Sequence, residues 1–327
     1  MISSRLVWFR RLAAFGALLA LLVVVLGAWV RLNTAGLGCP DWPGCYGHLT
    51  AGAAAENAEA VNQAFPERPV EYAKAVKEMV HRYFAITLGL VCVVLAIIAL
   101  VNRKDSEQPV ALPVALVGLV ILQGLLGMWT VTLLLKPLIV TLHLIGGLAT
   151  MSLLAWLAMQ PTVAAATDSK LKTLAVASLA MLSLQIALGG WTSSNYAAVA
   201  CPDFPTCQAA YWPEMDAKDA FVLWRGLGID YEGGVLDHPA RVAVHFTHRM
   251  GAVLATLLIA LLGWRLVREP ATRADGAAVL AVLLLQLSLG VSIVWFGVPL
   301  PVAVLHNGVA ALLLLAVINA NQRIRQR

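Results

Sequence analysis

Charged residues are scarce in this sequence: Asp, Glu, Lys and Arg make up 13% of its 327 residues, whereas hydrophobic residues make up 60%. The sequence also lacks low-complexity stretches, polar linkers and any segment polar enough for a separate soluble domain. Because a typical soluble domain carries about 25% charged residues, this composition excludes a soluble protein. We therefore predict an integral membrane protein, in which the net charge of +5 reflects topology rather than nucleic-acid binding.

Apolar runs long enough to cross a bilayer, which takes about 20 residues per helix, recur along the chain. There are eight, at residues 12–30, 75–101, 110–131, 138–159, 172–192, 241–264, 276–296 and 302–320. The first run has the alternative interpretation of a cleaved signal peptide, but Trp29-Val30-Arg31 lacks the small residues of a cleavage site. The predicted fold class is therefore an all-α membrane protein with eight transmembrane helices.

The distribution of basic residues predicts the orientation, since cytoplasmic segments of membrane proteins are enriched in Lys and Arg. With the N-terminus inside, 13 of the 23 basic residues fall in inner segments: Arg5, Arg10, Arg11, Arg103, Lys104, Lys170, Lys172, Arg265, Arg268, Arg273, Arg323, Arg325 and Arg327. Both termini are then cytoplasmic, and the long loops 31–74 and 193–240 lie outside a plasma (inner) membrane.

The second half of the chain repeats the first at an offset of 162 or 163 residues. The matched pairs are Trp29 and Trp191, Asn33 and Asn195, Cys39 and Cys201, Asp41 and Asp203, Cys45 and Cys207, Gln123 and Gln286, Gly127 and Gly290, and His143 and His306. His81 matches His248 at an offset of 167, so the second outer loop is about five residues longer. Such a parallel repeat predicts two pseudo-symmetric four-helix bundles, formed by residues 1–165 and 166–327.

Four of the five cysteines lie in the two outer loops, in the motifs C39-P-D-W-P-G-C45 and C201-P-D-F-P-T-C207. The outside of a plasma membrane is oxidising, so we expect a disulfide within each pair. Cys92 lies in the middle of an apolar run and is interpreted as a small buried hydrophobic residue.

Two histidines in each half lie within apolar runs, and all four are near the outer ends: His81, His143, His248 and His306. An imidazole inside a membrane is costly unless a partner binds it. One alternative is hydrogen bonding between helices, and another is a zinc or copper site, which needs a third or fourth ligand. Haem needs only two axial histidines, so the pairs favour one haem site in each half.

Arg82 and Arg249 directly follow two of these histidines. An arginine at this depth fits a contact with a haem propionate, and reaching the lipid headgroups is the alternative. One turn before the same histidines, Glu78 stands in the first half and His245 in the second. This divergence predicts one catalytic and one supporting site. If the helix that carries both residues is rotated, His245 is the alternative to His248 as axial ligand.

The combination of these motifs resembles the haem A synthase family over nearly the whole chain. The resemblance is carried by E78-M-V-H81-R82, H245-F-T-H248-R249, His143, His306, the paired outer cysteines and G228-I-D-Y-E-G-G-V-L-D237. It implies an enzyme of haem biosynthesis that oxidises the C8 methyl of haem O to a formyl group, by successive hydroxylations and loss of water, to give haem A for cytochrome oxidase.

The resemblance also implies residue roles. A haem b cofactor would be bound by His248 and His306, with Arg249 beside it. The haem O substrate would lie near His81 and His143 of the N-terminal half, with Arg82. Glu78 would be the catalytic carboxylate, as a general base or by stabilising a developing cation, and orienting its helix end or His81 is the alternative. The cysteine pairs would be structural staples, with a redox role as an alternative for Cys39 and Cys45.

The expected partners are haem O, a haem O synthase, an electron acceptor and membrane lipid, with no nucleic acid, and the sequence is compatible with a homo-oligomer.

The main alternative function is a b-type di-haem electron-transfer cytochrome, which would place its haems at different depths rather than at one side. A transporter would need Gly/Pro-broken helices at the midplane, and a quinone-linked disulfide oxidoreductase would leave the four histidines without a role.

Overall fold

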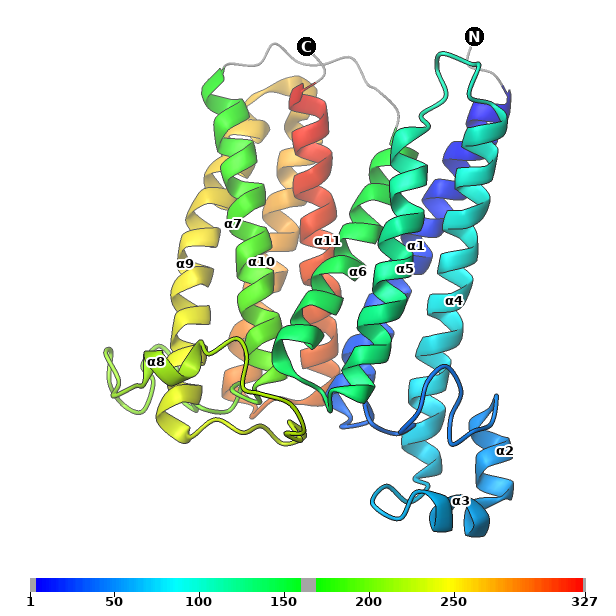
Figure 1. Cartoon of the computed structure of the whole chain (residues 1–327). Helices are drawn as coiled ribbons and strands as arrows, with labels where there is room; N and C mark the ends of the chain where they lie inside the picture. Colours follow the sequence, from blue (N-terminus) through cyan, green and yellow to red (C-terminus); the bar gives the residue numbers. More distant parts are fainter. Residues whose placement is uncertain (1–3, 160–168, 326–327) are drawn as a thin grey trace. The chain divides into compact units, whose positions relative to one another are not determined.

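The computed structural model describes residues 4–159 and 169–325, and within these residues the chain is helical with no strand (Figure 1). Eight helices are long and apolar enough to cross a membrane. They are α1 (Ser4–Leu32), α4 (Tyr72–Val101), α5 (Ala111–Thr132), α6 (Pro137–Ala158), α7 (Ser169–Ser194), α9 (His238–Arg268), α10 (Arg273–Trp295) and α11 (Leu300–Arg325). The predicted all-α membrane fold is therefore confirmed, and the protein is a multi-pass membrane protein.

Several helices extend beyond the apolar runs from which they were predicted. The helix α4 begins at Tyr72, and α9 begins at His238 with Pro239 in its first turn, where a proline needs no hydrogen-bond partner. The outer loops also contain the short helices α2 (Ala51–Glu56), α3 (Ala58–Ala64) and α8 (Ala217–Ala220), and the 3-10 turn η1 (Pro270–Thr272) precedes α10. Hydropathy did not reveal these segments because they are too short and polar to span a membrane.

The chain divides into two compact units, one formed by Met1–Met151 with Leu223–Val235 and the other by Ser152–Val222 with Leu236–Arg327. The predicted boundary between residues 165 and 166 lies outside the described residues. One segment of the second outer loop thus belongs to the N-terminal unit, which the internal repeat did not indicate.

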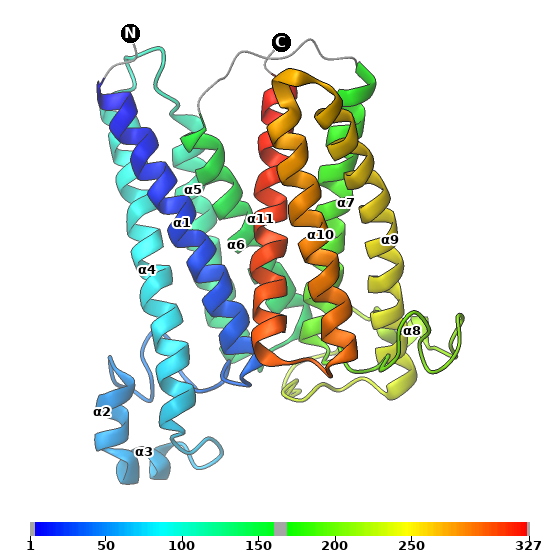
Figure 2. The same ribbon diagram turned by 180° about the vertical axis from the view of Figure 1, so that it is seen from behind.

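Each unit contains a set of membrane helices that pack side by side (Figure 2). In the C-terminal unit, α7 packs on α9, α9 on α10, α10 on α11 and α11 on α7, which closes a four-helix bundle. In the N-terminal unit, α1 packs on α4 and α4 on α5. The helix α6 approaches α1 and α5 closely through Gly146 and Gly147, which lie against Gln123 and Val24. Small residues at such crossings allow membrane helices to approach one another.

The outward faces of the spans are apolar and open. Leu18 of α1, Ile97 of α4 and Leu257 of α9 are more than half exposed. Lipid covers such side chains in a membrane, and the helical backbone satisfies its own hydrogen bonds there.

The segment Leu223–Val235, here called the strap, is fixed to the N-terminal unit by a buried tyrosine. The side chain of Tyr231 is only 2% exposed. It packs with Leu37, Val131 and Leu135 in one hydrophobic cluster. Its backbone N–H also donates to the carbonyl oxygen of Leu134, 3.0 Å away.

Cations from the N-terminal unit hold the strap at two further points. The guanidinium of Arg68 pairs with Asp230 at 2.5 Å and with Glu232 at 2.7 Å. Lys136, in the turn between α5 and α6, donates to the carbonyl oxygen of Gly226. Its ammonium lies 3.5 Å from the ring centroid of Trp224, a cation–π geometry. Burial lowers the pKa of Lys136, and the carbonyl and the aromatic ring compensate part of the lost hydration.

We predict that Tyr231→Ala detaches the strap without unfolding the helices. Truncation of a buried aromatic side chain costs about 3–5 kcal/mol, and here the cost falls on a peripheral segment. Limited proteolysis of the purified protein should show new cleavage within residues 223–235. Tyr211→Ala, at a tyrosine that is 79% exposed, is the matched control and should leave the cleavage pattern unchanged. Equal protection of the strap in both variants would contradict this anchoring.

Candidate functional site

The two histidines of the N-terminal unit face each other across the helices. His81 of α4 and His143 of α6 have ring centroids 6.4 Å apart and ring planes at 82°. Each ring lies against a glycine of another helix. A Cβ atom at Gly27 of α1 would lie 3.1 Å from His81 Cε1, and one at Gly127 of α5 would lie 3.5 Å from His143 Cε1.

The C-terminal unit repeats this arrangement with His248 of α9 and His306 of α11. A Cβ atom at Gly189 of α7 would lie 3.2 Å from His248 Cε1, and one at Gly290 of α10 would lie 3.2 Å from His306 Cε1. Gly27 and Gly189 match at the offset of 162 residues, and Gly127 and Gly290 match at 163. The duplication therefore includes the surface against which each imidazole rests.

These imidazoles fit axial ligation of a haem. Within the described residues, Nδ1 of His81, His143 and His306 has no hydrogen-bond partner, although it is buried. A buried polar group without a partner is costly, so these rings suit a group that the chain itself does not provide. No cluster of three or more His, Cys, Asp or Glu side chains that could hold a metal ion occurs in the described parts of the chain. The donor set thus matches a porphyrin iron with two axial ligands better than zinc or copper.

Each outer loop contains a disulfide, Cys39–Cys45 in one and Cys201–Cys207 in the other. An aspartate closes each turn. Asp41 accepts hydrogen bonds from the backbone N–H groups of residues 46 and 47, both at 2.6 Å. Asp203 accepts from those of residues 208 and 209, at 2.8 and 3.0 Å. The Thr206 hydroxyl, which also donates to Asp203, and these N–H groups lower the pKa of that carboxyl.

Arg82 and Arg249 bind the carbonyl groups of these two disulfide loops. Arg249 donates to the carbonyl oxygens of Cys201, Asp203 and Thr206 at 2.8, 2.9 and 2.7 Å. Arg82 donates to the carbonyl oxygen of Asp41 at 3.0 Å and to that of Gly44. Sequence reasoning did not find this role, because the loop carbonyls carry no signal in the sequence. That the two arginines also contact haem propionates stays a prediction.

Glu78 and His245 link the same arginines to the helices. The side chain of Glu78 is 5% exposed, and one oxygen accepts from the Cys39 backbone N–H at 2.9 Å while the other pairs with Arg82. The ring of His245 lies with Nε2 3.3 Å from Arg249 Nε. The structure therefore places Glu78 and His245 at the junction of helix and disulfide loop, and it places His248, not His245, against Gly189.

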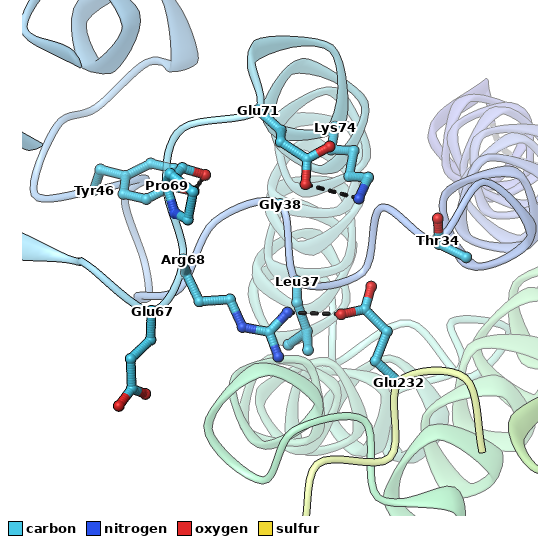
Figure 3. A pocket seen from close by; sticks show the side chains of 10 residues that line it. All are labelled: Thr34, Leu37, Gly38, Tyr46, Glu67, Arg68, Pro69, Glu71, Lys74 and Glu232. Carbon is cyan, nitrogen blue, oxygen red and sulfur yellow. Dashed lines mark hydrogen bonds and ion pairs between the residues drawn. The ribbon is translucent and has the colours of Figure 1, made fainter. Parts of the chain in front are cut away.

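A polar pocket of about 110 Å³ lies near the first disulfide loop of the N-terminal unit (Figure 3). Four of its charged side chains form ion pairs, Arg68 with Glu232 of the strap and Lys74 with Glu71. None of the four membrane histidines lines it. The pocket is thus separate from the histidine sites, which the helices themselves enclose.

Comparison with known proteins identifies the family. The model of the COX15-CtaA family, described as cytochrome oxidase assembly protein, matches residues 10–318. The chain belongs to this family. The match begins within α1, ends within α11 and includes both disulfide loops, so family membership applies to both halves of the fold.

Curated relatives align along almost their full length. A protein of Shewanella oneidensis named Heme A synthase is 42% identical over 322 residues, which cover 97% of this chain and 96% of the relative. Proteins of the same name from Caulobacter vibrioides and Halalkalibacterium halodurans are each 29% identical, and the matches cover 93% of this chain in both cases and 92% and 94% of the relatives.

We predict that both disulfides are present in the aerobically isolated protein and that the second pair is structural. Closing a loop with a sequence separation of 6 stabilises a fold by about 2 kcal/mol in the chain-entropy model. Cys201→Ser combined with Cys207→Ser should therefore lower the unfolding temperature. The activity per folded molecule should stay close to that of the wild-type protein. Peptide mass mapping without reductant checks the bonds. Four free thiols in the outer loops would refute the prediction that both disulfides are present.

Proposed function

We propose that the protein is a haem A synthase, an oxidoreductase that converts the C8 methyl of haem O to a formyl group for cytochrome oxidase. The observation that carries the proposal is the 42% identity, over 97% of the chain, to a relative named Heme A synthase. The two matched histidine pairs supply a physical reason, because the reaction needs a haem as substrate and can use a second haem as cofactor.

The reaction requires successive oxidations of one carbon. Two hydroxylations convert the methyl first to a hydroxymethyl and then to a gem-diol, which loses water to give the aldehyde. Each hydroxylation takes its oxygen from water and releases two electrons and two protons, so an electron acceptor is a necessary partner. A haem O synthase is the partner class that would supply the substrate.

We assign the cofactor to the C-terminal half, where His248 and His306 would hold haem b with Arg249 beside it. A haem b bound there would supply an iron centre for single-electron transfer. The chain's own contribution is to hold the two imidazoles in a bundle of apolar helices, where Gly189 and Gly290 leave room at the ring edges. Restricting water in this way keeps electrostatic interactions strong.

We assign the substrate haem O to the N-terminal half, near His81 and His143, with Arg82. The 6.4 Å spacing of these rings supports the assignment. A metal–imidazole bond of about 2 Å on each side sets ring centroids about 6 Å apart. We also propose that the outer loops lie outside the plasma membrane, with both termini in the cytoplasm.

Glu78 is the proposed catalytic carboxylate. It lies one turn before His81 on the same helix face. The Cys39 N–H and Arg82 fix its orientation. Such a fixed carboxylate can remove a proton from water or stabilise positive charge that develops on the oxidised carbon. The corresponding residue of the second half is His245, which explains why one half alone would carry this chemistry.

We predict that His248→Ala and His306→Ala each remove most of the low-spin haem b absorbance from the purified protein. His81→Ala and His143→Ala should instead abolish haem A formation and retain more of the resident haem. Extraction and mass analysis of the pigment, with and without a haem O source, measure both properties. Haem b at full occupancy in both C-terminal variants would overturn the ligand assignment. Failure of the wild-type protein to acquire formyl haem would favour a b-type electron-transfer cytochrome instead.

We predict that Glu78→Gln leaves a folded, haem b-loaded protein that forms haem A about 10²–10⁴-fold more slowly, the usual loss when a general acid–base group is removed. Gln removes the charge and keeps one oxygen, which can accept from the Cys39 N–H or from Arg82 but not from both, as the two carboxylate oxygens do. The hydroxylated intermediate should accumulate, as measured by mass analysis of extracted haem. Glu71→Gln, at the exposed N-cap of the same helix, is the matched control. Near-normal haem A output from Glu78→Gln would make this residue purely structural.

A further inference from the structure

The two histidine pairs differ in what touches their rings. In the C-terminal unit, the amide nitrogen of Gln185 on α7 lies 3.1 Å from His248 Nδ1 and donates to the His248 carbonyl oxygen, 3.0 Å away. The amide nitrogen of Gln286 on α10 lies 3.2 Å from His306 Nε2. Both rings of this pair therefore have a side-chain amide beside them.

The N-terminal pair lacks these contacts in the described structure. The offset of 162 residues that aligns Gly27 with Gly189 also aligns Val23 with Gln185, so the first amide is replaced by an apolar side chain. The Val23 backbone, rather than a side-chain amide, forms a hydrogen bond with the His81 ring. Gln123 aligns with Gln286, but its amide nitrogen has no partner, and neither has His143 Nδ1. The amide nitrogen of the shared glutamine lies against Gly146 instead.

A second substitution accompanies the first. Gly251 follows His248 by three residues, and a Cβ atom there would overlap the Gln185 amide oxygen. The offset of 167 that aligns His81 with His248 places Phe84 at this position in the first half. The C-terminal half thus combines a long amide with a glycine that makes room for it, and the N-terminal half combines a short Val23 with a large Phe84. The structure shows the contact between these two positions only in the C-terminal half, because Phe84 is 37% exposed.

Contacts to the outer nitrogen of a metal-binding imidazole fix the ring and its tautomer, and their removal typically costs about 10- to 100-fold in affinity. Gln185 occupies Nδ1 of His248 and leaves Nε2 as the nitrogen available to iron. Iron at Nε2 requires a hydrogen on Nδ1. The Gln185 amide oxygen has no other partner and can accept that hydrogen after a half-turn of the carboxamide. This exchange gives up the bond from the amide nitrogen to the His248 carbonyl oxygen.

We propose that Gln185, with the space at Gly251, positions His248 so that the C-terminal half retains its haem permanently, whereas the N-terminal half binds and releases haem as substrate and product. Gln286 is not part of this proposal, because its amide lies beside Nε2 of His306 and leaves Nδ1 without a partner. Gln185 is a positioning residue that acts through His248. This inference rests on the proposed function, because it explains how one duplicated site can be a cofactor site and the other a substrate site.

The test uses the full-length protein, purified with haem b alone from cells that have no haem O source. The rate of haem b transfer to excess apomyoglobin and the midpoint potential are measured. Gln185→Met keeps the side-chain length but removes the amide, and we expect transfer to be about 10- to 100-fold faster. We also expect a more positive midpoint potential, because the variant should bind ferric haem less tightly relative to ferrous haem. If this preference falls tenfold, the midpoint potential rises by about 59 mV for a one-electron couple.

Two further variants separate this role from a general effect on folding. Gly251→Ala keeps Gln185 but displaces its amide, and it should change both readouts in the same direction. Ser183→Val, at an exposed position two residues away on α7, should change neither. In the reverse exchange, Val23→Gln with Phe84→Gly should slow the release of haem from the N-terminal half, as measured by haem O that stays bound after purification.

Unchanged transfer rate and potential in both Gln185→Met and Gly251→Ala, at wild-type haem content, would overturn the inference. The proposed function is tested separately by His248→Ala. Full haem b occupancy in that variant would refute the cofactor assignment, independently of the transfer rates and potentials of Gln185→Met and Gly251→Ala.

Discussion

Placing four imidazoles between apolar membrane helices is the constraint on which the rest of this structure depends. Each ring needs space beside it and a partner for its nitrogens, since neither lipid nor an apolar side chain can satisfy them. Space is provided at the same place in both units, by Gly27 and Gly127 in one and by Gly189 and Gly290 in the other. The helices α4, α6, α9 and α11 carry the rings, and their neighbours are shaped around them.

The disulfide loops connect the outer ends of these helices to the histidine sites. In each unit an arginine one residue after the histidine donates to the carbonyl groups of the loop, and an aspartate within the loop binds two of its backbone N–H groups. Loop and helix are therefore joined by charge-assisted hydrogen bonds, which are stronger than neutral ones. Glu78 belongs to this network, so its position is determined jointly by α4 and by the backbone of Cys39.

The duplication gives the protein two similar sites, and a few replacements make them different. The first half has Glu78 where the second half has His245, which changes the charge beside the arginine. The first half has Val23 where the second half has Gln185, which changes the contact to the imidazole. The strap adds a larger asymmetry, because a segment of the second loop contributes Tyr231 to the core of the N-terminal unit. A shared scaffold thus supports different chemistry through local contacts, without any change in the helical framework.

The sequence alone determined the eight membrane helices, the internal repeat, the pairing of the outer cysteines and the four histidines. These features depend on local composition and on periodic spacing, which are visible in one dimension. Only the tertiary structure decided what Arg82, Arg249 and Glu78 touch, and that Leu223–Val235 packs with the N-terminal unit. The amide contacts of Gln185 and Gln286 also emerged only there, because Gln123 aligns with Gln286 and yet its amide nitrogen lies against Gly146 without a hydrogen-bond partner. Such differences arise from packing between residues far apart in the chain, where the size of a side chain on one helix determines the direction of a side chain on another.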